Sequence, residues 1–126
     1  MQEEQSCILV VEDDEMTRES IVELLREANY SVSQATNGAE ALSKLRQEPP
    51  PCVILLDLMM PVMTGQEFRR EQLKDPALAA IPVIVVSAAE LWQLKSLKAA
   101  ACLSKPFTAE RLLTSVSQYC RGGIAW

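Results

Sequence analysis

The chain has 126 residues, of which 48% are apolar and 23% charged, enough for one domain with an ordinary hydrophobic core. The net charge of -5 argues against a nucleic-acid-binding surface, and no apolar stretch approaches the roughly 18 residues that a membrane span needs. The start of the chain is polar and acidic, unlike a signal peptide. We therefore expect one domain over residues 1–126, with a core over about 7–120, that acts in the cytoplasm without nucleic acid or membrane.

Some residue types that carry chemistry are absent or scarce. The chain has no histidine, which excludes serine and cysteine catalysis through histidine, histidine-ligated zinc and a phosphohistidine donor. Its four glycines form no phosphate-binding loop. No C-x-x-C pair occurs among the four cysteines, so we expect four buried free thiols in a reducing compartment, with a disulfide or metal role as the minor alternative: Cys7, Cys52, Cys102 and Cys120.

The first half of the chain alternates between strand and helix signals. An apolar run predicts a strand at Cys7–Val11, and an i, i+3, i+4, i+7 stripe predicts a helix at about Met16–Ala28. Asp14 and Glu15 are expected to be first-turn helix acids, and Arg18 to be solvated. A short strand at about Ser31–Ala35 and a helix at about Ala39–Gln47, capped by Asn37, follow.

The second half continues the alternation after the loop Pro49–Pro51, where proline prevents a helix. The predicted elements, in chain order, are a strand at Cys52–Leu56, a helix at about Thr64–Lys74, a strand at Val83–Val86, a helix at about Glu90–Ala100, a very short strand at Cys102–Leu103 and a helix at about Thr108–Cys120. The pattern predicts an α/β fold of the flavodoxin-like (βα)5 type, with a parallel sheet in the order 2-1-3-4-5 and helices on both faces.

Polar side chains end several of the predicted strands. With the first and third strands adjacent, Glu12 and Asp13 would lie against Asp57. Carboxylates in such a cluster repel one another and raise each other's pKa values, and a divalent cation is the usual way to keep them ionised. Ser87 follows the fourth strand and Lys105 the fifth, so a hydroxyl and an ammonium are expected on the same edge.

Together these residues resemble the receiver domain of two-component response regulators. The matching segments occur in the family's order, with similar spacing, over nearly the whole chain: Ile8–Asp14, Leu55–Pro61, Thr64–Gly65, Ile81–Ile84, Ser87–Ala88 and Leu103–Phe107. The resemblance implies that Asp57 is the phospho-acceptor, taking a phosphoryl group from a phosphohistidine of a partner kinase or phosphotransfer protein. Such a domain is not a turnover enzyme, and it signals through contacts with a downstream protein.

The resemblance also implies a role for each residue of the edge. Asp13, Asp57 and the backbone carbonyl of Met59 would bind Mg²⁺, and Glu12 would act through a metal-bound water. Ser87 would donate a hydrogen bond to the phosphoryl group. Lys105 would pair with Asp57 and then with a phosphoryl oxygen, and its peptide bond to Pro106 would be cis.

The chain departs from the family pattern in three places. Cys102 stands where an aromatic residue is usual, and Ser87 and Lys105 are 18 positions apart, which predicts a short fourth helix. The third helix is polar at Arg69 and Gln72. We therefore expect a switch through Ser87 and residues 88–90, moving a helix that carries Leu91, Trp92 and Leu94, with Trp92 as a partner anchor if it is exposed.

Two other functions compete with this interpretation. A Mg²⁺-dependent phosphohydrolase of the haloacid-dehalogenase type also uses an aspartate nucleophile, but it needs a second aspartate where Met59 stands. A pseudo-receiver that binds partners without being phosphorylated is favoured by Cys102 and opposed by Asp13, Asp57 and Lys105.

Overall fold

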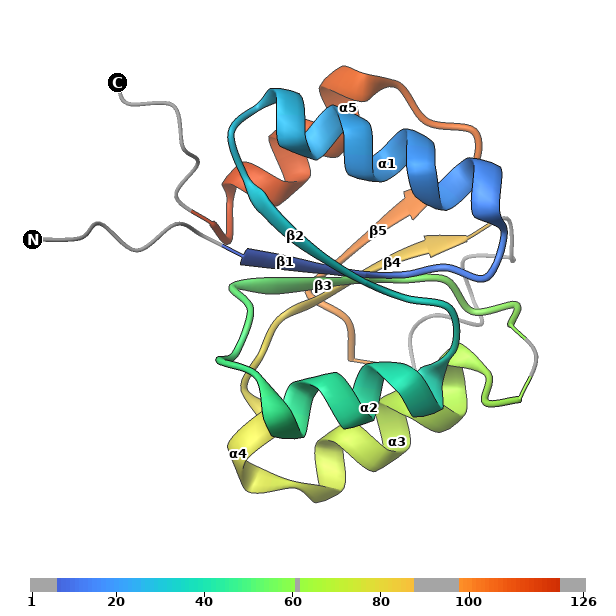
Figure 1. The fold of residues 1–126 in the computed structure, drawn as a ribbon, viewed down its shortest axis with the longest axis vertical. Coiled ribbons are helices and arrows are strands. Elements are labelled where there is room, and N and C mark those ends of the chain that lie inside the picture. Colours follow the sequence, from blue (N-terminus) through green and yellow to red (C-terminus); the bar gives the residue numbers. More distant parts are fainter. Residues whose placement is uncertain (1–6, 61, 88–97, 121–126) are drawn as a thin grey trace, which may run out of the picture.

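Five parallel strands form one sheet in the order β2-β1-β3-β4-β5 (Figure 1), which confirms the predicted flavodoxin-like topology. The computed structural model describes residues 7–60, 62–87 and 98–120. The strands are β1 (Cys7–Val11), β2 (Ser31–Ala35), β3 (Val53–Leu56), β4 (Val83–Ser87) and β5 (Ala101–Ser104). Every strand pair is parallel, so the carboxyl ends of the strands lie along one edge of the sheet.

Helices cover both faces of this sheet. One face carries α1 (Glu15–Glu27) and α5 (Ala109–Ser117), and the other carries α2 (Gly38–Gln47), α3 (Gly65–Lys74) and the short α4 (Pro76–Ala79) (Figure 1). Each of these five helices begins at a side chain that accepts a backbone N–H of the first turn, which satisfies a donor the helix leaves unpaired: Asp14, Asn37, Thr64, Asp75 and Thr108. Asn37 is thus confirmed as a cap.

Strand β3 lies at the centre of the core. All four of its side chains are buried, alternately against the α2–α3 side and the α1–α5 side. On the α1–α5 side, Ile21 and Leu25 of α1 pack with Leu112 and Val116 of α5. This two-sided burial is what holds the carboxyl ends of β1 and β3 in a fixed relation.

The polar third helix has a structural explanation. Gln72 is fully buried, and its Nε2 donates to the carbonyl oxygens of Leu78 at 2.8 Å and Ile81 at 3.1 Å. Arg69 is also buried and donates to Gln72 Oε1 at 2.7 Å and to the carbonyl oxygen of Lys98 at 2.9 Å. The two Gln72 contacts satisfy buried carbonyl groups within and just after α4, a helix that the sequence analysis did not predict.

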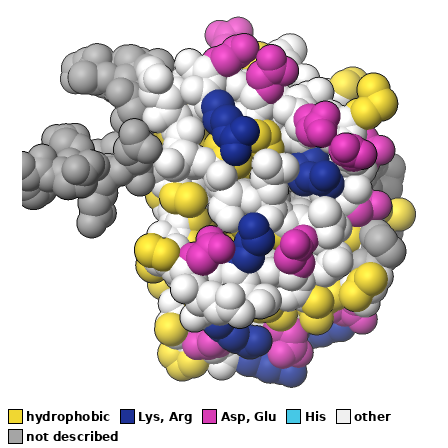
Figure 2. Space-filling view, viewed as in Figure 1, with side chains coloured by type: hydrophobic (Ala, Val, Ile, Leu, Met, Phe, Trp, Pro, Cys, Tyr) yellow, Lys and Arg dark blue, Asp and Glu magenta, His cyan; other side chains and the backbone are white. Residues whose placement is uncertain are grey.

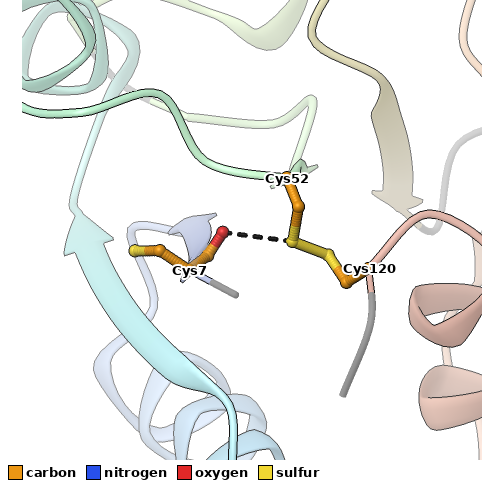
Figure 3. Close-up of a disulfide and its surroundings, with 3 residues drawn as sticks. All are labelled: Cys7, Cys52 and Cys120. Atoms are coloured by element: carbon orange, nitrogen blue, oxygen red, sulfur yellow. Dashed lines mark hydrogen bonds between the residues drawn. A yellow bond between two sulfur atoms is a disulfide. The ribbon is translucent and has the colours of Figure 1, made fainter. Parts of the chain in front are cut away.

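The prediction of four buried free thiols is wrong. Cys52 and Cys120 form a disulfide (Figure 3), Cys7 is half-buried and Cys102 is exposed. The pair is separated by 68 residues and meets only because the end of α5 packs beside the start of β3. Such a contact belongs to the tertiary fold and leaves no signal in cysteine spacing.

Several expectations fall on residues outside the described part of the chain. These are most of the helix expected at Glu90–Ala100, the loop before it and Trp92 with its neighbours. Within the described residues, no helix is long and apolar enough to cross a membrane. The face seen in Figure 2 intersperses acidic and basic side chains without a continuous basic region.

Candidate functional site

Three carboxylates converge where β1 and β3 end. Val11 pairs with Leu56 across the two strands, and the N–H of Asp57 donates to the carbonyl oxygen of Val11 at 3.0 Å, so the residues that follow each strand are brought together. Glu12, Asp13 and Asp57 each place a carboxylate oxygen within 4.8 Å of the others. Glu12 and Asp57 are buried and Asp13 is exposed, as an open binding edge requires.

Lys105, which follows β5, brings an ammonium to this cluster. Its Nζ lies 2.9 Å from Glu12 Oε1 and 3.7 Å from Asp57 Oδ1. The pairing with Asp57 expected from the family is present, but the shorter contact is with Glu12. The other oxygen of Glu12 accepts the N–H of Asp14 at 3.2 Å, so the longer glutamate side chain connects Lys105 to the loop after β1.

The three carboxylates of the cluster have the ammonium of Lys105 as a nearby positive charge, so negative charge is in excess. Burial and the neighbouring Glu12 raise the pKa of Asp57 to about 6, against the smaller opposing effects of Lys105 and the N–H of Met59. Burial alone would lower the pKa of Lys105, but the combined pull of Glu12 and Asp57 raises it. Hard oxygen donors that are short of positive charge suit a divalent cation such as Mg²⁺, so the residues present fit this metal.

Ser87 and Met59 complete the predicted set. Ser87 ends β4 with its side chain buried, and its carbonyl oxygen accepts the N–H of Lys105 at 3.1 Å, which fixes the two residues on adjacent strands. Met59 directs its side chain to solvent at 70% exposure, while its N–H contacts the Asp57 carboxylate. All the predicted site residues therefore lie at one edge. The peptide bond between Lys105 and Pro106 is cis, as expected.

Gly65 is packed against the backbone of the acceptor segment. A Cβ atom at this position would lie 2.7 Å from the carbonyl oxygen of Asp57 and 2.7 Å from two atoms of Leu58, closer than real contacts allow. The N–H of Gly65 also donates to the carbonyl oxygen of Leu58 at 3.1 Å. The position of the start of α3 is therefore tied to the position of Asp57.

Arg18 is a site residue that the sequence analysis missed, because the prediction of a solvated side chain is wrong. The half-buried guanidinium donates to the carbonyl oxygen of Glu12 at 2.9 Å and to Gln34 Oε1 at 3.2 Å. It thereby fixes the peptide that carries Asp13. A charged residue one turn into a helix gives no sequence signal for this contact.

Asp14, by contrast, was expected as a first-turn helix acid and is the residue that caps α1, while Glu15 lies in the first turn. Its carboxylate accepts the N–H of Thr17 at 2.9 Å and the hydroxyl of the same residue at 2.6 Å. These bonds lower its pKa, with small further contributions from Lys105 and Arg18. Asp14 is therefore engaged by the helix, whereas Asp13 is directed to the cluster.

Comparisons with known proteins agree with this geometry. A family model described as the response regulator receiver domain matches residues 8–117. Protein PilH of Pseudomonas aeruginosa is 32% identical over 120 residues, an alignment that covers 91% of this chain and 98% of PilH. The chemotaxis protein CheY4 of Vibrio cholerae has a similar structure, with a TM-score of 0.84 and 29% identity over 92% of this chain and 99% of CheY4.

A further solved structure carries a metal. The receiver domain of sensor histidine kinase PA1611 from Pseudomonas aeruginosa has a magnesium ion coordinated in its active site cleft. It is 24% identical with a TM-score of 0.84, covering 92% of this chain and 98% of that domain, and at this identity it supports the fold alone. The fold, the acidic edge and the match over residues 8–117 lead to one conclusion: the chain belongs to the response regulator receiver domains of two-component signalling, which are signalling modules rather than turnover enzymes.

Proposed function

We propose that Asp57 accepts a phosphoryl group from the phosphohistidine of a partner kinase or phosphotransfer protein, and that the domain then signals by contacts with a downstream protein. The observation that carries this proposal is the convergence of Asp57 with Glu12, Asp13 and Lys105 on one sheet edge of a receiver fold.

The chain's own residues account for the chemistry of the transfer. A carboxylate oxygen of Asp57 attacks the phosphorus, the bond from phosphorus to the donor nitrogen breaks, and the electron pair stays on the imidazole of the donor. Lys105 then exchanges its contacts with the carboxylates for a phosphoryl oxygen, and the hydroxyl of Ser87 donates to another. The raised pKa of Asp57 means that the ionised nucleophile needs added positive charge.

Mg²⁺ is the proposed source of that charge. Asp13, Asp57 and the carbonyl of Met59 would hold the ion, with Glu12 acting through a water. Bound there, the ion would neutralise charge on the carboxylates and on the incoming phosphoryl group. Support comes from the three carboxylate oxygens that lie within 4.8 Å of one another and from the shortage of positive charge around Asp57.

We further propose that residues 1–126 act as one receiver domain, with its core at about 7–120, in the cytoplasm. Asp14 provides a matched control for the acceptor, because it is a nearby carboxylate that only caps α1.

The test is intact-mass measurement after incubation with acetyl phosphate, with and without Mg²⁺. One phosphoryl adduct is expected in the wild type and in Asp14→Asn, none in Asp57→Asn, and none when the metal is chelated. Undiminished labelling of Asp57→Asn would show that the acceptor is another residue. Absence of labelling in the wild type, together with unchanged partner binding, would favour the pseudo-receiver.

A further inference from the structure

The disulfide lies at the edge of the sheet opposite to the acidic cluster. Cys52 directly precedes β3, whereas Asp57 follows it, so the strand separates the two groups. Cys120, seen beside Cys52 in Figure 3, follows the last turn of α5. Its side chain is buried. The proposed phosphoryl chemistry uses neither sulfur atom.

The backbone holds both cysteines in place without help from the sulfur–sulfur bond. The N–H of Cys52 donates to the carbonyl oxygen of Cys7 at 2.8 Å, and the N–H of Cys120 donates to that of Val116 at 3.0 Å. The two Cα atoms are 5.4 Å apart, within the range that a disulfide spans without backbone movement. These backbone contacts do not depend on the sulfur–sulfur bond, so they would keep the two residues close in the reduced form.

The reduced form also has a partner for its proton. Cys52 Sγ lies 3.3 Å from the carbonyl oxygen of Cys7, the contact drawn in Figure 3, so a free thiol at this position would have a hydrogen-bond acceptor. Cys7 itself directs its sulfur away from the disulfide in the same view. Both redox states are thus accommodated by one backbone arrangement, which is the requirement for reversible closure.

Accessibility favours attack at one end of the pair. Cys52 is partly exposed, whereas Cys120 is buried. An external reagent would therefore meet Cys52 first, and Cys120 would resolve the mixed disulfide that forms.

We propose that Cys52 and Cys120 are a reversible redox site, closed by exchange with a low-molecular-weight disulfide and opened by the corresponding thiol. The thiolate of Cys52 attacks the external disulfide and releases one thiol. The thiolate of Cys120 then attacks Cys52 Sγ and releases the second, so two protein thiols are oxidised and one external disulfide is reduced to two thiols.

Closing the bond restrains the end of α5. In the open form, this end is held by the packing of Val116 and by the Tyr119 hydroxyl, which donates to the carbonyl oxygen of Ala100 at 3.1 Å. In the closed form it is also covalently joined to β3 across 68 residues of chain, which restricts the unfolded state strongly. Oxidation would thus stabilise the domain at the amino edge of the sheet, opposite to the proposed phosphorylation site.

The test equilibrates the full chain in glutathione buffers that range from fully oxidised to fully reduced. After an acid quench and unfolding, maleimide labelling and intact mass count the free thiols. The expected result is a change from two labels to four at an intermediate ratio, and a melting temperature higher by about 10 °C in the oxidised form.

Matched variants identify the pair. Cys102→Ser should lose one label in both states and keep the temperature shift, because Cys102 is exposed and free. Cys120→Ser and Cys52→Ser should each abolish the shift. Four labels at every ratio would overturn the proposal, as would a bond that stays closed in the fully reduced buffer.

Discussion

The two edges of the sheet are stabilised in opposite ways. At the carboxyl edge, Glu12 and Asp57 are buried beside each other, and Lys105 forms ion pairs with both carboxylates that partly offset their repulsion. At the amino edge, Cys52 and Cys120 are joined covalently. The difference teaches that the carboxyl edge carries a repulsion that an added cation would relieve, whereas the amino edge supplies stability. Each edge should therefore respond to a different reagent.

The largest expected effect concerns metal binding at the carboxyl edge. Asp13→Ala should weaken Mg²⁺ binding by about 100-fold, because it removes a proposed direct ligand. Asp14→Ala should change it less than about threefold, because that carboxylate caps α1. Calorimetric titration of both variants measures the difference. Equal losses would mean that the ligand is the neighbouring residue.

The second prediction removes the repulsion between the carboxylates of Asp57 and Glu12. Asp57→Asn should raise the metal-free stability at pH 7 by about 1–3 kcal/mol, because the pKa of Asp57 is about 6 in the fold against 3.8 in its ordinary state. Between these two pH values the folded state binds more protons than the unfolded state, so the wild type should lose stability as the pH rises from about 4 to about 6.

Denaturant unfolding of both proteins at pH 4 and pH 7 without metal tests this linkage. The advantage of the variant should largely vanish at pH 4, and saturating Mg²⁺ should reverse it at pH 7. A pH-independent advantage would show that the effect comes from side-chain packing rather than charge.

Removing the ammonium group of Lys105 should change the metal-free stability in the opposite direction. Lys105→Ala should lower the metal-free stability at pH 7 by about 1–2 kcal/mol, since it leaves the carboxylate of Glu12 buried without its 2.9 Å partner. Metal binding should persist, but NMR shift changes far from the site on adding beryllofluoride should be lost. Identical distant changes in both proteins would contradict the role proposed for Lys105.

The smallest expected effect tests the support of the site. Arg18→Gln should weaken Mg²⁺ binding by about threefold to fivefold, because the peptide before Asp13 loses its charged hydrogen bond. Arg26→Gln removes the same charge from the last turn of α1 and should leave affinity near wild type. Similar losses in the two variants would indicate a long-range charge effect instead of positioning.

The local patterns of the sequence predicted the strands, because buried parallel strands are short apolar runs with polar ends. The same runs located Glu12, Asp13 and Asp57, since a parallel sheet brings those ends together. Arg18 and the disulfide could not be predicted in this way. Each depends on a contact between segments that are brought together only in the tertiary fold.

The third helix illustrates the same limit. Its polar positions looked like an unusual surface, but Gln72 is buried and binds the carbonyl oxygens of Leu78 and Ile81. Polar residues that satisfy buried backbone groups follow neither helical nor strand periodicity. Their burial was therefore visible only once α4 was placed.

Gly65 has a consequence for how this sequence can drift. Because Gly65 has no side chain, the backbone of Asp57 and Leu58 can lie close to its Cα atom. Even a methyl group at this position would displace the acceptor segment or the start of α3. Position 65 contributes no side-chain functional group, yet the proposed phosphoryl transfer would constrain it through the backbone of Asp57. A mutation there would therefore disturb the proposed acceptor while leaving every charged side chain of the site in the sequence.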